Sequence, residues 1–598
     1  MNKRYLWSID EIVSEDQIQQ LIGHRYFALT TRIFLDTKPG IKPQTADEVP
    51  KEIITYLQLF PHYPHIPQVY GQIDGTNTWL LDYGTIPLNS EGKLQHTQLL
   101  PELTSLWRSA TAFQQLSWLR QIAKLWRPTL HKKVASTLLT PELLRINGQV
   151  VQVMQLKPDI PYSPRLQDLG KLWGQWAEYS HPSVRDMLIQ LCDRLKIGSL
   201  SKSRQIMAIL DRAMELYQRS QQYSYQIYAV SESGPSRNNN EDAAYPNFDT
   251  PINVQGDNNP LAIVCDGVGG HEGGEIASRD TIEYLRNHIA QLSFTEVQNN
   301  PQLVAKKLIQ LINESNDLIS QRNDSEQRLE RQRMGTTLVM GLAHNHEIYL
   351  AHVGDSRIYW ITPNSCHQVT VDDDLASREV RLGYAVYRDS LEYPSAGALI
   401  QALGMRDSAA LHPNVQRHLI DDDCVFLLCT DGLSDFDRIE QHWRQIILPV
   451  LQGKRDLVSA VKTLIKIANE KNGHDNATVA LVHCQVKSKT EETAINLTWS
   501  DVELGSKELN SWSDTDPSET VLPKTEAVDT NIPPQPTEIS PIPKKSSGWL
   551  KSLVILLMVS FVVGCIFYLF LLNETKKNPD NRNLRESEEM LEELKLNK

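Results

Sequence analysis

The sequence has little of what marks several common classes of protein. Basic residues are in the minority, because 60 Lys and Arg stand against 73 Asp and Glu and give a formal net charge of −13. Binding of nucleic acid is therefore not expected, since neutralising phosphates needs clustered basic side chains in excess. The seven cysteines are scattered through 598 residues without C-x-x-C spacing. That pattern excludes a disulfide framework and a C-x-x-C zinc site, and it favours a reducing compartment.

Signals for export and for nucleotide binding are also missing. The first stretch, "MNKRYLWSIDEIVSE", soon turns polar and acidic and lacks the apolar core of a secretory signal. We therefore expect the soluble bulk of the chain to lie in the cytoplasm. Neither G-x-G-x-x-G nor G-x-x-x-x-G-K-[ST] occurs, so a nucleotide-binding loop is not indicated.

The composition changes along the chain, and its length exceeds what one hydrophobic core supports. Leu, Trp and amphipathic stretches mark residues 1–223, whereas residues 224–486 alternate strand-like and helical runs. Residues 487–548 are dense in Ser, Thr, Pro, Glu and Asp, which predicts a disordered linker. We predict an α+β protein with a mainly helical regulatory domain at 1–223 and a separate domain at 224–486.

One long apolar run stands near the end of the sequence. Residues 553–572 read "LVILLMVSFVVGCIFYLFLL" without a charge. Because about 20 apolar residues cross a bilayer core of ~30 Å, we predict a transmembrane helix at 549–572 and a short charged tail at 573–598. Basic residues flank the run on both sides, so the positive-inside rule does not orient it.

Carboxylates recur at the ends of the strand-like runs. Asp266 follows an apolar run and precedes a glycine cluster in "IVCDGVGGHEGGEIAS" (263–278). Further acids stand in "GPSRNNNEDA" (234–243), "HVGDSRIY" (352–359), "LCTDGLSDF" (428–436) and "GHDNATVALV" (473–482). Clustered carboxylates suit hard divalent ions such as Mg²⁺ and Mn²⁺. Glycine at position 267 would let its carbonyl serve as one more oxygen ligand.

These motifs, in this order, resemble those of the metal-dependent serine/threonine phosphatases of the protein phosphatase 2C (PPM) family, bacterial branch. The resemblance rests on Asp-Gly-x-Gly-Gly-His-x-x-Gly-Glu-x-Ala-Ser, preceded by Arg-x-x-Asn-Glu-Asp-Ala and followed by Gly-Thr-Thr (335–337) and the acidic motifs quoted above. It covers most of 224–486. It implies a β-sandwich flanked by helices, with two Mn²⁺ or Mg²⁺ ions in a cleft at one end.

The resemblance also implies a role for each acidic motif. Asp266 would bridge two ions, and the carbonyl of Gly267 would complete the first. Asp431 and Asp475 would hold the second ion. The remaining residues would surround these ions: Glu241 and Asp242 on metal-bound waters, Arg237 on the substrate phosphate, and Asp355 and Asp435 at a third, weaker metal.

Such a site needs no nucleophilic side chain. Two cations ~4 Å apart make hydroxide available near neutral pH for in-line attack on phosphorus. The general acid for the departing oxygen is expected to be His271, because histidine titrates near pH 7. Eukaryotic members place this acid directly after the Asp-Gly pair, where this chain has Val268. Two roles therefore stay open for His271, protonation of the leaving group and tuning of substrate choice.

A second departure lies in "VTVDDDLAS" (369–377), where Asp373 stands at a position that bacterial members fill with histidine. The segment that follows, residues 378–404, corresponds to the mobile flap over the cleft of the family. We expect it to set substrate selectivity.

The amino-terminal region carries a weaker resemblance. "LHKKVASTLLTPELLRINGQVVQVMQL" (130–156) is similar to the catalytic loop and following hairpin of protein kinases, with Asn147-Gly148 suited to a tight turn. Ser136-Thr137-Leu138 replaces His-Arg-Asp, and Leu143 replaces the metal-binding Asn, so phosphoryl transfer is not expected. A degenerate kinase-like module and an unrelated helical regulatory domain are the two alternatives.

The sequence thus predicts a membrane-tethered phosphatase acting on phosphoserine and phosphothreonine in proteins, with a kinase as a further candidate partner. The alternative is a phosphatase-like domain without turnover that binds phosphoproteins or kinases. The joint presence of Asp266, Asp431 and Asp475 disfavours this alternative, because clustered charge is costly unless cations occupy the site.

Overall fold

The computed structural model describes residues 4–46, 48–82, 99–218, 221–247, 249–255, 259–268, 273–292, 301–488 and 496–505. These residues belong to one compact unit, Met1–Leu522. Within them, no helix combines the length and apolar character needed to cross a membrane. The predicted transmembrane helix (549–572), the charged tail (573–598), His271 and most of the predicted linker lie outside the described residues.

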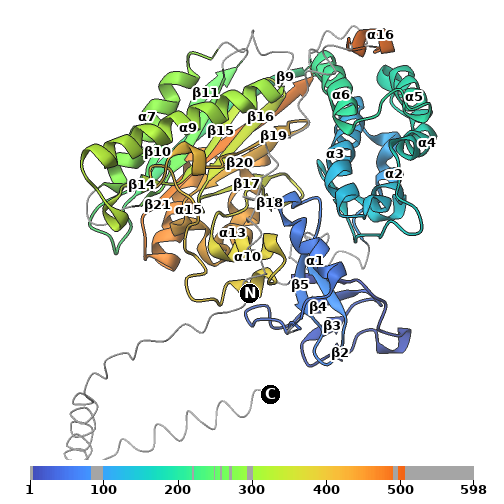
Figure 1. Cartoon of the computed structure of the whole chain (residues 1–598), viewed down its shortest axis with the longest axis horizontal. Coiled ribbons are helices and arrows are strands. Elements are labelled where there is room, and N and C mark those ends of the chain that lie inside the picture. Colours follow the sequence, from blue (N-terminus) through green and yellow to red (C-terminus); the bar gives the residue numbers. More distant parts are fainter. Residues whose placement is uncertain are drawn as a thin grey trace, which may run out of the picture. The chain divides into compact units, whose positions relative to one another are not determined.

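Two antiparallel sheets form the larger part of the unit (Figure 1). The first has the order β10-β12-β15-β16-β19 and the second the order β11-β9-β21-β20-β17-β18. Their strands are β9 (Gln221–Glu232), β10 (Ala243–Tyr245), β11 (Ile252–Gln255), β12 (Leu261–Cys265), β15 (Leu338–His344), β16 (Glu347–Val353), β17 (Arg357–Ile361), β18 (Cys366–Gln368), β19 (Asn414–Leu419), β20 (Cys424–Cys429) and β21 (Ala477–Ser488). A short ladder pairs β13 (Gly267–Val268) with β14 (Gly335–Thr336).

The sheets bury apolar side chains between them and against helices on their outer faces. Val264 and Phe426 belong to the cluster between the sheets. On the outer faces, α7 (Gly274–Ile289) and α9 (Pro301–Ser325) cover the first sheet, and α13 (Arg438–Ile446) and α15 (Leu457–Ile467) cover the second (Figure 1). Shorter helices are α10 (Leu375–Leu382), α11 (Tyr387–Ser390), α12 (Asp431–Ser434) and α14 (Leu448–Leu451). This is the predicted sandwich flanked by helices.

Strand register brings the acidic motifs to one end of the sandwich. Ala243 pairs with Cys265, so Asp242 and Asp266 leave adjacent strands side by side. In the other sheet, Cys429 pairs with both Arg357 and Val479. The loops that follow β16 and β20 and precede β21 therefore meet at the same edge as the first pair.

The amino-terminal region is not mainly helical throughout, and this part of the prediction needs correction. A six-stranded antiparallel sheet of order β2-β3-β4-β1-β6-β5 precedes the helices. It comprises β1 (Arg4–Ser8), β2 (Leu21–Ile22), β3 (Tyr26–Ala28), β4 (Ile33–Asp36), β5 (Gln68–Gln72) and β6 (Trp79–Asp82), with α1 (Lys51–Gln58) between β4 and β5. Strands of two to five residues are too short to show the alternation that identifies a strand in a sequence.

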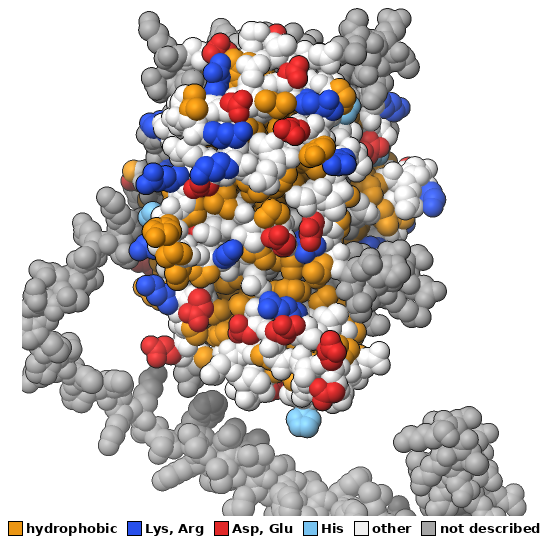
Figure 2. Space-filling view, turned by 90° about the vertical axis from the view of Figure 1, so that its right-hand side faces the viewer, with side chains coloured by type: hydrophobic (Ala, Val, Ile, Leu, Met, Phe, Trp, Pro, Cys, Tyr) orange, Lys and Arg blue, Asp and Glu red, His pale blue; other side chains and the backbone are white. Residues whose placement is uncertain are grey.

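Helices dominate after this sheet, and the predicted hairpin at Asn147-Gly148 is present. The elements are α2 (Leu103–Leu106), α3 (Ala112–His131), β7 (Leu144–Asn147), β8 (Val150–Val153), α4 (Leu166–Ala177), α5 (Pro182–Lys196) and α6 (Ser203–Tyr217). The kinase-like module and the unrelated regulatory domain both stay predictions for residues 1–223. On the side shown in Figure 2, basic and acidic side chains are interspersed, so neither sign of charge covers that face alone.

Part of the predicted linker at 487–548 contains a helix. Residues 496–505 include α16 (Trp499–Val502), in which Trp499 and Val502 are buried. The guanidinium of Arg194 lies 4.1 Å from the centre of the Trp499 ring, and Leu497 N–H donates to the Ser183 carbonyl at 2.7 Å. A few well-spaced apolar side chains thus dock on α5 and α6 despite polar surroundings.

Candidate active site

Asp266 lies at the end of β12, and threonines of the neighbouring strand segment hold its backbone. Its N–H donates to the Thr337 hydroxyl at 3.0 Å, and its carbonyl accepts from the Thr337 N–H at 2.8 Å. These bonds leave the carboxylate to face the other acids. Burial, followed by the negative charges of Asp242 and Asp431, raises the pKa of Asp266 well above its ordinary value.

Asp242 is 8% exposed, and two hydroxyl groups donate to one of its oxygens. Thr430 Oγ1 lies 2.9 Å and Thr478 Oγ1 2.8 Å from Asp242 Oδ2. Burial nevertheless raises the pKa of Asp242 to about 7, against the lowering effect of these hydrogen bonds. The two hydrogen bonds therefore fix the position of the Asp242 carboxylate. They do not offset the effect of burial on its pKa.

Asp431 begins α12, directly after β20. Burial and the charge of Asp435 raise its pKa to about 6. Its Oδ1 atom is buried and has no hydrogen-bond partner among the described residues. An unpartnered, buried carboxylate oxygen is an unsatisfied acceptor, which a cation would satisfy.

Asp355 and Asp435, the predicted pair for a third metal, lie in the same acidic surroundings. Burial and the charge of Asp431 raise the pKa of Asp355 well above its ordinary value. Burial also raises the pKa of Asp435, although Arg357 and His474 oppose this effect. His474 Nε2 lies 3.2 Å from Asp435 Oδ2.

Arg237 lies at the exposed rim of the cluster. Its Nη2 donates to Asp475 Oδ2 at 2.7 Å, its Nε donates to the His474 carbonyl at 3.2 Å, and its side chain is 50% exposed. A half-exposed guanidinium next to buried acids can reach a phosphate group from solution.

Gly267 lies where no side chain fits. A Cβ atom there would come within 2.5 Å of the Glu241 carbonyl oxygen and 2.4 Å of the Gly274 carbonyl. The close approach brings Glu241 to the start of α7. Burial and the charge of Glu275 raise the pKa of Glu241.

The donor set fits hard divalent cations. Burial raises the pKa values of Asp266 and Asp431, and the unpartnered Oδ1 atom of Asp431 belongs to the set. In the part of the chain that the structure describes, no three His, Cys, Asp or Glu side chains form a closed metal-binding group. Mg²⁺ and Mn²⁺ do not need one, because such ions keep several waters and take one or two carboxylates each.

Several residues that shape the site were not singled out in the sequence. Asn476 Oδ1 accepts from the Glu241 N–H at 2.9 Å, and its Nδ2 donates to the carbonyls of Ser233 and Asn239. Asn476 thereby fixes the loop that carries Arg237. Thr430 and Thr478 act on Asp242 as described. Thr430 and Asn476 adjoin the predicted acids Asp431 and Asp475, and Thr478 follows Asp475 by three residues, so proximity to those acids was the signal available.

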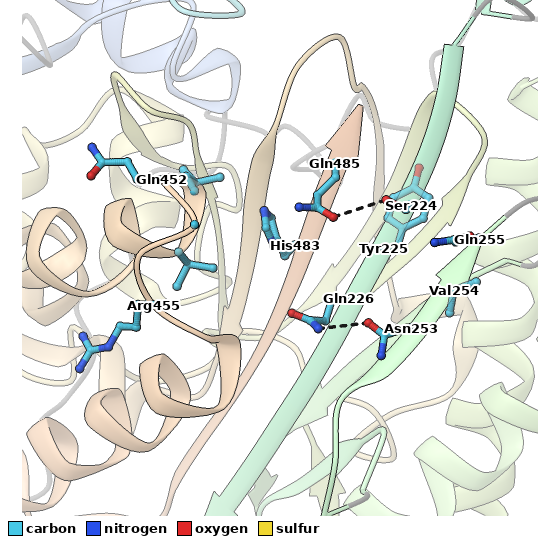
Figure 3. Close-up of a pocket in the computed structure, with 13 residues that line it drawn as sticks. Ser224, Tyr225, Gln226, Asn253, Val254, Gln255, Gln452, Arg455, His483 and Gln485 are labelled. Atoms are coloured by element: carbon cyan, nitrogen blue, oxygen red, sulfur yellow. Dashed lines mark hydrogen bonds between the residues drawn. The ribbon is translucent and has the colours of Figure 1, made fainter. Parts of the chain in front are cut away.

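A separate cavity of about 490 Å³ opens beside β9, β11 and β21 (Figure 3). Gln226 donates to Asn253 at 3.1 Å and Ser224 donates to Gln485 at 3.5 Å along its wall. None of the predicted site residues lines it. We assign it no part in the chemistry.

Comparison with known proteins identifies the family of residues 238–473. The family model "Protein phosphatase 2C" matches residues 238–473. A serine/threonine phosphatase of Listeria monocytogenes, stp, is 30% identical over 238 residues, which are 40% of this chain and 90% of that protein. The protein phosphatase PhpP of Streptococcus pneumoniae is 29% identical over 258 residues, or 43% of this chain and 96% of that protein. The chain belongs to the protein phosphatase 2C family, and its enzyme class is that of the protein serine/threonine phosphatases.

Solved structures also match this region. The crystal structure of the Mycobacterium tuberculosis serine/threonine phosphatase PstP/Ppp is 28% identical, covers 44% of this chain and 98% of its own, and has a TM-score of 0.36. A structure of the PstP catalytic domain, described as a complex with two manganese ions, is 28% identical with a TM-score of 0.35 and covers 44% of this chain and 99% of its own.

Proposed function

We propose that this chain hydrolyses phosphoserine and phosphothreonine in proteins with a water molecule activated by two divalent cations, Mn²⁺ or Mg²⁺. The observation that carries the proposal is the group of carboxylates around Asp266, whose pKa values are raised by burial first and by the charges of neighbouring carboxylates second. When bound there, such cations would supply a hydroxide nucleophile near neutral pH and would offset charge on the phosphoryl oxygens.

The residues of the chain divide the remaining work. Asp266, Asp431 and Asp475 would hold the cations, with the Gly267 carbonyl as a further ligand. The Thr430 and Thr478 hydroxyls orient Asp242 toward the cluster. Arg237 would bind the substrate phosphate from the rim, where its side chain is half exposed. Protonation of the departing oxygen is assigned to His271, which lies outside the described residues.

The decisive experiment measures hydrolysis of a phosphothreonine peptide by the purified full-length chain in detergent. We expect turnover with Mn²⁺, loss of turnover with chelator, and loss of turnover in Asp266→Asn. The matched control is Asp280→Asn, an acid of α7 that pairs with Arg322 at 2.8 Å outside the cluster. Turnover that needs neither metal nor Asp266 would contradict the mechanism, and absence of turnover on any phosphopeptide would favour a binding module.

We also propose that the apolar run 553–572 anchors the enzyme in a membrane with the phosphatase domain in the cytoplasm. Its length and lack of charge support the proposal. Cell fractionation tests it: the full chain should sediment with membranes, and a chain ending at residue 548 should be released. A full chain that stays in the supernatant would contradict it.

A further inference from the structure

Residues 372–393 form a segment that includes α10 and α11. This segment packs against the amino-terminal part of the chain, residues 1–223. Val380 and Val386 belong to the same hydrophobic cluster as Ile53 of α1. The rings of Phe60 and Tyr387 stack with centroids 5.7 Å apart. Contacts of this kind exclude water and fix the orientation of α11.

Charged side chains extend this contact. Lys42 Nζ lies 3.1 Å from Asp389 Oδ1 and 3.0 Å from Glu392 Oε2. Arg388 stacks over the Tyr70 ring, 4.6 Å from its centre, and donates to the Pro39 carbonyl at 3.2 Å. The loop before α1 and strand β5 thus contact the segment from the amino-terminal side.

The other end of the same segment is bound to the acidic site. Asp373 N–H donates to the Gly354 carbonyl at 2.8 Å, and Gly354 N–H donates to Asp373 Oδ2 at 3.1 Å. Gly354 directly precedes Asp355. Arg357 Nη2 donates to Asp372 Oδ2 at 2.7 Å, and Asp374 Oδ1 accepts from the Ser377 N–H at 2.7 Å to cap α10. Movement of α10 would therefore pull on the loop that holds Asp355.

Tyr387 links the two ends. Its ring stacks on Phe60, and its hydroxyl group lies within electrostatic reach of Arg357, Asp372 and Asp374. One side chain thus connects the amino-terminal part to the ion pair that anchors the loop after β16.

The segment also presents apolar side chains to solvent. Tyr384 is 69%, Leu391 50% and Tyr393 42% exposed. Large exposed hydrophobic side chains near an active site are suited to contact the polypeptide around a phosphorylated residue.

We propose that Lys42 and Phe60 are positioning residues that hold residues 372–393 beside Asp355, so that the amino-terminal part sets the affinity of the phosphatase for protein substrates. This inference rests on the proposed function and adds a substrate-binding element to it. On this proposal a phosphopeptide would contact the segment through the residues around its phosphate, whereas a small aryl phosphate has no such residues. Disturbing the contact should therefore affect the two substrates differently.

The test compares full-length wild type with Lys42→Glu and Phe60→Ala, using a phosphothreonine peptide and p-nitrophenyl phosphate. Lys42→Glu should raise KM for the peptide about threefold, as expected for reversal of an exposed ion pair, and Phe60→Ala about tenfold. For p-nitrophenyl phosphate, kcat and KM should change by less than about twofold. Hydrogen exchange of residues 375–391 should accelerate in both variants.

Two controls separate positioning from general damage. Combining Lys42→Glu with Asp389→Lys and Glu392→Lys restores opposite charges and should return the peptide KM toward wild type. Lys171→Glu reverses a charge that pairs with Asp168 at 2.9 Å on α4 and should leave both substrates unaffected. Should Phe60→Ala fail to fold, Lys42→Glu and its rescue decide the question.

The outcomes distinguish this inference from the proposed function. A wild type that hydrolyses neither substrate would refute the proposed function, while hydrogen exchange would still report whether the contact restrains the segment. An active wild type with unchanged peptide KM in both variants would overturn the inference. A lower peptide KM in the variants would overturn it as well, because the contact would then hinder substrate binding.

Discussion

Two groups of buried acids in this chain have opposite electrostatic surroundings. In the first, Asp211 of α6 and Glu347 of β16 share Arg417, which lies 2.7 Å from Asp211 Oδ1. Burial acts to raise the pKa of Asp211, but Arg120 and Arg417 outweigh it and the pKa falls below its ordinary value. In the second group, around Asp266, burial and neighbouring carboxylates act in the same direction and raise the pKa.

The difference in electrostatic surroundings indicates different roles for the two groups of acids. The acids around Arg417 are neutralised by that arginine and by Arg120. They therefore form a complete ion-pair network that joins the amino-terminal helices to the first sheet. Among the residues that the structure describes, the main charged neighbours of Asp266 are all carboxylates, and Arg237 contacts Asp475 from the rim. Unbalanced buried charge is unfavourable for folding, and bound cations would remove that cost. This contrast separates a structural network from the proposed metal-binding one.

Replacing one acid in the Asp266 group should produce the largest effect. Asp266→Asn should lower kcat for a phosphothreonine peptide about 1,000-fold, because loss of cation-based stabilisation is worth several kcal/mol. In chelator, the same variant should unfold at higher denaturant than wild type, since one repelling charge is gone. A decrease in kcat of less than about tenfold would contradict the assignment.

The corresponding change in the other group should affect stability instead. Asp211→Asn leaves Arg120 and Arg417 with less negative charge in a buried setting, and it should lower the free energy of unfolding by about 3 kcal/mol. The kcat of the folded fraction should stay unchanged. Asp168→Asn, which removes an exposed pair with Lys171, should cost less than about 1 kcal/mol. Equal costs for the two variants would show that burial does not distinguish them.

The acids of the site could be predicted from the sequence because each follows or precedes a recognisable strand. Asp266 follows an apolar run and Asp475 precedes one, so their meeting at one edge needed only the antiparallel order of the strands. The balanced network could not be predicted in this way. Asp211 and Arg417 are about 200 residues apart, and neither stands in a motif. Their pairing depends on how α6 lies against β19, which local patterns do not encode.

The fold was also predictable only where the sequence has a local signature. Strand β20 is a continuous run of buried apolar residues, and the turn at Asn147-Gly148 between β7 and β8 has its own signature. The amino-terminal sheet was missed because β2 and β3 contain two and three residues. Its strands are fixed by long-range pairing and by contacts such as Arg25 with Asp36 at 2.8 Å.

The pH dependence of stability tests the charge imbalance of the acids around Asp266. The ordinary pKa of Asp is 3.8, whereas Asp431 titrates at about 6 and Asp242 at about 7 in the folded chain. Folded-state values above the unfolded ones mean that stability is full below about pH 4 and is lost as the pH rises toward 7. In chelator we expect a loss of at least about 3 kcal/mol across this window by chemical denaturation, since the shift of Asp431 alone corresponds to that amount. Saturating Mn²⁺ should flatten the curve, and a curve unchanged by Mn²⁺ would argue against cation binding at these acids.

The smallest expected effect comes from the hydroxyl groups that donate to Asp242 and partly offset the effect of burial on its pKa. Thr430→Val keeps the shape of the side chain but removes the hydrogen bond of 2.9 Å to Asp242 Oδ2 and the acceptor for the Thr478 N–H. It should lower the free energy of unfolding in Mn²⁺ by about 1.5 kcal/mol. In chelator, the pH at which stability is lost should move upward, because the ionised carboxylate loses a donor. Thr430→Ser retains the hydroxyl and should keep the wild-type midpoint, whereas a shift shared by both variants would trace the effect to packing.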